Sequence, residues 1–200
     1  MPEIPSASQR VLDAAARKGV TLEIVTFDDS THTAEDAARA VGAEVGQIVK
    51  SLVFVADRDD GPEPCLVLVS GANMVDVSLL AAVLTELRMR RATADEARDF
   101  TGYSIGGIPP FGHTRPIRTV MDPDLGRFGT VWAAAGTPNT VFAVTPGTLR
   151  MLANANVAPI ASAPLRPSEQ RASDAPDTGG PAGTTGAPGA PGATGAPSGA

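Results

Sequence analysis

The feature that most constrains the fold is a pair of apolar runs joined by an acidic, turn-forming segment. The runs cover residues 48–56 and 65–70, and Asp57-Arg58-Asp59-Asp60-Gly61-Pro62 lies between them. Both runs have strand length and are rich in β-branched and large apolar residues. Asp, Gly and Pro are typical of turns. We therefore expect two strands in an antiparallel hairpin with an extended loop.

Shorter patterns on either side predict helices and strands in irregular order. Expected helices run from a Ser8 cap to about Lys18, from Thr33 to Gly42, over 77–87 on a stripe of leucine and valine, from the capping box at Thr93 to Gly102, and onward from Thr145-Pro146. Expected strands cover 22–27, 89–92, 117–121, 130–135 and 140–144. Since strands and helices do not alternate regularly, we expect an α+β domain with a mixed, largely antiparallel, barrel-like sheet and peripheral helices.

The composition changes near Ala161. After Leu165 the chain is dominated by Gly, Pro, Ala, Ser and Thr, and such a segment buries too little apolar surface to fold. We expect one domain over residues 1–160 and a disordered Gly/Pro/Ala-rich tail over 161–200. Glycine recurs every third residue from Gly180 to Gly195, so a short triple-helical or partner-binding segment is the alternative.

Lys50 lies within the first apolar run. The chain has 16 basic residues, of which only Lys18 and Lys50 are lysines. An ammonium group is costly to bury without a partner, so a lysine in such a run usually lies at an edge, forms a pair or takes part in chemistry. Lys50 is therefore either a strand-end residue whose side chain reaches solvent or a functional residue.

A second candidate is the loop at 102–113, which contains four glycines and two prolines. A ligand can approach the N–H groups of Gly106 and Gly107 closely, and two such donors can bind an anion or a carbonyl oxygen. The alternative is a rigid surface loop that packs Ile108 and Phe111 on the core. The turn that begins at Gly136 and Thr137 joins two expected strands and could line a pocket.

Other kinds of site find little support. The net charge of −6 argues against a protein that coats nucleic acid. Cys65 is the only cysteine, and the two histidines, His32 and His113, lie far apart in sequence, so neither a metal site nor a covalent nucleophile is expected. His113 could act as a general base, although a structural role is the simpler interpretation. The N-terminus lacks the apolar stretch of a signal peptide and no segment is apolar enough to span a membrane, so we expect a cytoplasmic protein.

Three segments together resemble one known family. They are Ile48-Val49-Lys50-Ser51-Leu52-Val53-Phe54, the segment from Thr101 to His113, and Ala135-Gly136-Thr137-Pro138. In order and spacing they are similar to the YbaK/EbsC family, the editing domain also found in or associated with prolyl-tRNA synthetase. The resemblance covers nearly all of residues 8–155.

The resemblance implies an aminoacyl-tRNA deacylase that acts in trans without a cofactor or a protein nucleophile. It places Lys50 in the pocket at the aminoacyl or terminal-adenosine end and gives Gly106 and Gly107 the role of donors to the ester carbonyl. Phe27, Ser51, Gly136 and Thr137 would bind the substrate. Ala134 and Val141 stand where some members carry a hydroxyl and a carboxylate, so the amino acid is left open.

Two other functions stay open on the sequence. A non-catalytic module could use the same pocket to bind tRNA or a nucleotide, or could dock on a synthetase. An interaction protein could recruit a partner through its tail. The expected partners are aminoacyl-tRNA and a synthetase, with no role for DNA or a membrane.

Overall fold

The computed structural model describes residues 4–27 and 33–162. The chain divides into two units, Met1–Leu165 and Arg166–Ala200, and only the first contains described residues. His32 and nearly all of the expected tail lie outside them. The tail stays a prediction, although Ala161 and Ser162, which composition assigned to it, form a short strand.

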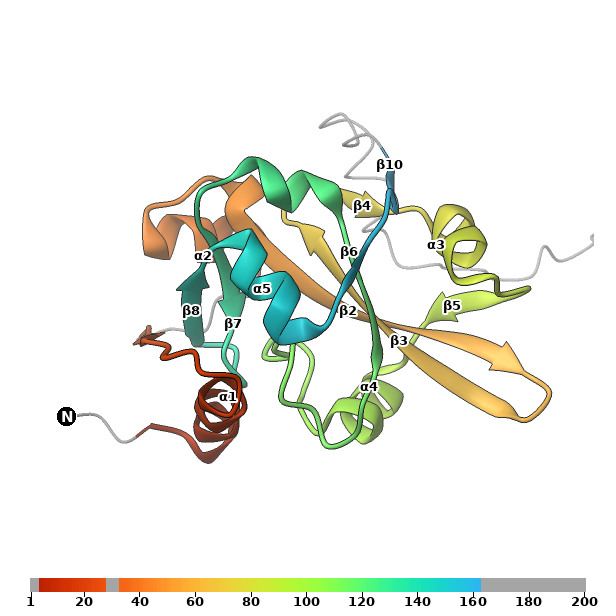
Figure 1. Ribbon diagram of the computed structural model, residues 1–200, viewed down its shortest axis with the longest axis horizontal. Coiled ribbons are helices and arrows are strands. Elements are labelled where there is room, and N and C mark those ends of the chain that lie inside the picture. Colours follow the sequence, from red (N-terminus) through yellow and green to blue (C-terminus); the bar gives the residue numbers. More distant parts are fainter. Residues whose placement is uncertain (1–3, 28–32, 163–200) are drawn as a thin grey trace, which may run out of the picture. The chain divides into compact units, whose positions relative to one another are not determined.

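The described residues form an α+β domain (Figure 1). The helices are α1 (Ser6–Ala16), α2 (Ala34–Val41), α3 (Val77–Leu84), α4 (Ala94–Thr101) and α5 (Pro146–Ala153), with 3-10 turns η1 (Val45–Gln47) and η2 (Pro123–Arg127). The strands are β1 (Ile24–Thr26), β2 (Ile48–Arg58), β3 (Gly61–Ser70), β4 (Met74–Val75), β5 (Met89–Arg91), β6 (Arg118–Met121), β7 (Val131–Ala134), β8 (Thr140–Val144), β9 (Asn156–Val157) and β10 (Ala161–Ser162).

The main sheet has the strand order β1-β8-β7-β2-β3-β6-β9, with β5 also paired to β2. The pairs β2–β7, β3–β6 and β6–β9 are parallel, whereas the others in the described part of the chain are antiparallel. The expected α+β class with a mixed, largely antiparallel sheet is confirmed. Figure 1 shows the long β2–β3 hairpin crossing the domain.

Alternation along β2 and β3 explains the two main parts of the core. Val49, Val53, Leu66 and Leu68 point to one side, where they pack with residues of α1, α5 and the glycine loop. Cys65, Phe54, Val67 and Val69 point to the other side and pack with Leu80 and Leu84 of α3. Both faces of the hairpin are covered, which explains why its sequence is almost continuously apolar.

Three local expectations were wrong. Ser8 does not cap α1, which begins at Ser6; its buried hydroxyl instead lies 3.2 Å from Thr140 Oγ1, a tertiary partner. The hairpin loop is short, because the strands continue to Arg58 and Gly61. Helix α3 ends at Leu84, where Thr85 takes a left-handed conformation, so Leu87 is fully exposed and does not extend the buried stripe.

Candidate active site

Strand β2 has an open edge in its middle. On the side opposite β3, it pairs with β7 at Ile48 and Val49 and with β5 from Phe54 to Ala56. No described strand pairs with this edge between those two positions. Ala92 N–H donates to the carbonyl of Val53 on this side, at 3.0 Å. Since backbone groups alternate along a strand, the N–H and C=O of Ser51 face the same opening.

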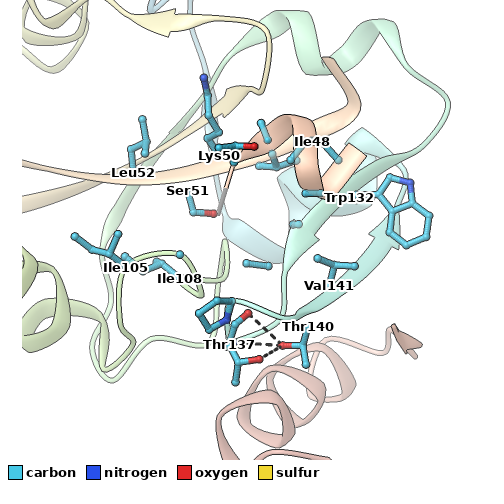
Figure 2. Close-up of a pocket in the computed structure, with 18 of the residues that line it drawn as sticks. Ile48, Lys50, Ser51, Leu52, Ile105, Ile108, Trp132, Thr137, Thr140 and Val141 are labelled. Atoms are coloured by element: carbon cyan, nitrogen blue, oxygen red, sulfur yellow. Dashed lines mark hydrogen bonds between the residues drawn. The ribbon is translucent and has the colours of Figure 1, made fainter. Parts of the chain in front are cut away.

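A pocket of about 270 Å³ lies at this opening (Figure 2). Its walls come from α2, β2, the end of β5, α4, the glycine loop, β7, the turn after β7, and β8. Most lining side chains are apolar. The polar ones are Thr33, Lys50, Ser51, Arg91, Thr137 and Thr140. A mostly apolar pocket with a few polar groups is typical of a small-molecule site.

Lys50 is half-buried at one end of this pocket. Its ammonium donates to the backbone carbonyls of Gly71 (3.0 Å) and Asn73 (2.6 Å). Burial lowers the pKa of Lys50, and the charge of Arg91 acts in the same direction, whereas Glu35 opposes the shift. An ammonium has three N–H groups. Two are used by these carbonyls, which leaves one N–H that they do not use.

The adjacent residue, Ser51, points the opposite way along the pocket. Figure 2 shows its hydroxyl directed away from the Lys50 ammonium and toward Thr137 and Ile108. The Ser51 hydroxyl oxygen is buried and has no hydrogen-bond partner within the described residues. Leaving a buried polar group unpaired costs ~1–3 kcal/mol. Such a group in a pocket indicates a place where a ligand can supply the missing bond.

The glycine loop and the turn after β7 meet at the pocket. A Cβ on Gly107 would lie 2.7 Å from Thr137 Cα and 2.8 Å from its carbonyl carbon, so only glycine fits there. The Gly107 N–H donates to the carbonyl of Ser104, at 3.1 Å, and Gly107 is not among the lining residues. Gly106 does line the pocket, and its N–H has no partner in the described part of the chain.

The turn after β7 is held by hydroxyl groups. Thr140 Oγ1 is buried and lies 2.7 Å from Thr137 Oγ1, and it accepts a hydrogen bond from the Thr137 N–H (Figure 2). Gly136 does not line the pocket; it lies where a Cβ would meet the backbone of Ala7 at 2.8 Å. Phe27 also lies outside the lining, and its N–H donates to the carbonyl of Asn139. Gly136 and Phe27 are thus placed to support the turn.

The remaining titratable candidates lie elsewhere. The His113 ring is 2.8 Å from the carbonyl of Pro109 through Nε2 and packs edge-on against Tyr103, and burial lowers its pKa. Burial raises the pKa of the Cys65 thiol to about 12. Within residues 4–27 and 33–162, no group of three or more His, Cys, Asp or Glu side chains could hold a metal ion, and no helix could cross a membrane.

Several lining residues were not identified from the sequence. Ile48, Trp132 and Thr140 lie in expected strands, and Arg91 lies in the strand expected over 89–92, so none of them was singled out as a site residue. Their role depends on β5, β7 and β8 meeting around one edge of β2, for which the local sequence carries no signal. Ala134 and Val141, paired across β7 and β8, also line the pocket, and both are apolar.

The family model and the similar proteins match most of this domain. Residues 28–152 match the model of the aminoacyl-tRNA editing domain family. YwhH of Bacillus subtilis (strain 168) is 31% identical over 62% of this chain and 76% of its own. The multifunctional Ser/Thr-tRNA deacylase ProXp-y of Escherichia coli (strain K12) is 28% identical over 64% of this chain and 77% of its own. A solved structure proposed to be a trans-editing enzyme for prolyl tRNA synthetase is 43% identical, with a TM-score of 0.74 over 80% of this chain and 99% of its own.

Proposed function

The chain belongs to the aminoacyl-tRNA editing domain family, and we propose that it is a deacylase that hydrolyses, in trans, the ester between a tRNA and a wrong amino acid. The family expected from the sequence is thereby confirmed. The observation that carries the proposal is the pocket at the open edge of β2, which holds Lys50, Ser51 and Gly106 together. Binding alone separates similar small amino acids poorly, which is the physical reason for a second, hydrolytic site.

The hydrolysis needs a water molecule that attacks the ester carbonyl and groups that stabilise the negative charge on its oxygen. A covalent route through Cys65 is disfavoured, because its thiol is buried with its pKa raised to about 12. His113 is bound to the carbonyl of Pro109. In our proposal the Gly106 N–H donates to the developing oxyanion. Gly107, whose N–H is already engaged, holds the loop against Thr137.

In this scheme Lys50 positions the substrate. The carbonyls of Gly71 and Asn73 fix its ammonium, so the direction of the third N–H is fixed as well. A fixed positive charge beside an apolar pocket suits the electron-rich end of the substrate, either the ester carbonyl or the terminal adenosine. Thr137 and Ser51 would contact the aminoacyl group, and Phe27 and Gly136 would support the turn.

We also propose that the protein meets its substrate in the cytoplasm, because aminoacyl-tRNA is made in the cytoplasm. We further propose that it acts alongside a synthetase. The likeness to a structure proposed to edit for prolyl tRNA synthetase supports this partner.

A panel of mischarged tRNAs tests the function. We expect the purified full chain to release amino acid from at least one of them and Lys50→Ala to lose most of that activity. Lys18→Ala is a matched control, because Lys18 also donates to two backbone carbonyls, those of Met151 and Leu152, yet lies outside the pocket. Lack of release from every tRNA would refute the proposal. Salt-sensitive tRNA binding without release would instead favour a binding module.

A further inference from the structure

Helix α3 differs from the other described helices in having no charged side chain. Residues 77–85 read Val-Ser-Leu-Leu-Ala-Ala-Val-Leu-Thr, whereas α2 exposes Glu35 and α4 exposes Arg98. A helix that is apolar on all sides is normally buried on all sides. In Figure 1, however, α3 lies at the edge of the domain, on the side away from α1. One apolar side of α3 is therefore left uncovered.

The uncovered side of α3 is a continuous strip. Leu80 and Leu84 are buried against the β2–β3 hairpin, whereas the adjacent pair, Leu79 and Val83, is 42% and 39% exposed. Residues four apart on a helix lie next to each other, so the exposed side chains of the two turns form one surface. We call this surface the outer face of α3, and it consists of Ser78, Leu79, Ala82 and Val83.

Exposed apolar side chains gather around this outer face. Of the ten exposed large apolar residues in the described part of the chain, five fall between Met74 and Leu87, and Leu87 is fully exposed. Single exposed apolar residues are normal, whereas a group of them in one area marks an interaction site. No residue of α3 lines the pocket at the open edge of β2, so this surface is separate from the candidate active site.

A second copy of the chain fits the outer face better than the remainder of the same chain does. After Ser162 the sequence contains a single large apolar residue, Leu165, which is too little to match an apolar surface of this extent. A second copy supplies an apolar surface of equal size. Each copy has a net charge of −6, but the outer face carries none of it, so two copies can meet there without like charges in contact.

The two ends of α3 carry opposite charges, which determines how two copies fit. Asp76 precedes the helix, and Arg88 follows it, exposed and without an ion pair in the described residues. In an antiparallel pair related by a twofold axis, the start of each helix lies beside the end of the other. Asp76 then meets Arg88 of the partner subunit at both ends. Ser78 and Ala82 are small, so the two helices can approach closely.

We propose that two copies of this chain pair through the outer faces of α3 in an antiparallel arrangement. Leu79 of each copy lies against Val83 of the partner subunit, and the ion pairs of Asp76 and Arg88 close both ends. An interface of standard size buries about 800 Å² on each partner, more than the outer face and Leu87 provide, so the dissociation constant is on the order of 10 μM. Because α3 lies outside the pocket, each copy keeps its own site.

Sedimentation equilibrium of the purified full chain from about 1 to 500 μM tests this pairing. We expect a monomer–dimer equilibrium. Leu79→Asp should raise the dissociation constant at least about 10-fold, because it places a charge against an apolar side chain. Met151→Asp is the matched control, because Met151 is 46% exposed on α5, and it should leave the equilibrium unchanged. Val83→Lys should also dissociate, and mixing it with Leu79→Asp should restore association, since opposite charges then face each other.

Several outcomes would overturn the proposal. A chain that stays monomeric at every concentration shows that a second copy does not cover the outer face. Association that Leu79→Asp leaves unchanged, or that Met151→Asp weakens equally, places the contact elsewhere. Arg88→Ala should weaken association and reduce its dependence on salt, and an unchanged equilibrium contradicts the antiparallel arrangement. Thermal melts of each variant verify that a loss of association is not caused by unfolding.

Discussion

Gly107 is the point at which the glycine loop touches the turn after β7, and replacing it with alanine tests this contact. The added Cβ would lie 2.7 Å from Thr137 Cα, 2.8 Å from its carbonyl carbon and 2.9 Å from its nitrogen. These are backbone atoms, so no rotamer change can relieve the overlap and one of the two segments must move. Forcing an extra carbon into a packed site typically costs ~1–3 kcal/mol.

We therefore expect Gly107→Ala to lower the free energy of unfolding by about 1–3 kcal/mol in urea titrations. Since Gly106 and Thr137 both line the pocket, the displacement should also lower kcat/KM for deacylation. Gly129→Ala is the control, because no atom lies within 4 Å of its Cβ position and its φ is not left-handed. If Gly107→Ala matches Gly129→Ala in both stability and activity, the two segments are not in contact and the site as described is incorrect.

Two further predictions concern how Lys50 is held. Asn73 donates through Nδ2 to Asp122 and Asp124, both at 2.8 Å, and its backbone carbonyl accepts from Lys50. Asn73→Ala removes the two side-chain bonds and should destabilise the fold by ~1.5–3 kcal/mol. It should also lower kcat more than it raises KM. An unchanged kcat in a folded Asn73→Ala would show that this clamp does not position Lys50. Burial lowers the pKa of Lys50, so the unfolded chain binds the Lys50 proton more tightly than the folded chain does. Between the lowered pKa and the ordinary value of 10.5, the free energy of unfolding should therefore rise with pH, measured relative to Lys50→Met. Urea titrations of both proteins across that pH range test this expectation. A difference in free energy of unfolding that stays flat or falls as the pH rises contradicts it.

The parts of the fold that the sequence predicts are those that neighbouring residues decide. Thr93 caps α4 with Glu96 in a reciprocal box, and Thr33 caps α2, both as expected, because these contacts span three residues. Ser8 shows the opposite case, since a serine near a helix start forms its bond with Thr140, 132 positions away. The same limit applies to the pocket. Lys50 and the glycine loop could be identified as candidates, but the open edge beside Ser51 exists only because β5 and β7 take separate parts of β2.

The open edge also explains why Lys50 and Ser51 can serve one pocket although adjacent strand residues point to opposite faces. Where β2 has no neighbour, a ligand can contact the edge and reach a side chain on each face. One more residue of β5 or β7 paired with β2 at this position would satisfy the Ser51 backbone and close this access, giving a better-paired sheet without a site. The Ser51 hydroxyl, which is buried and has no hydrogen-bond partner within the described residues, therefore represents stability that the fold gives up, and a ligand in the pocket can recover it by supplying the missing bond.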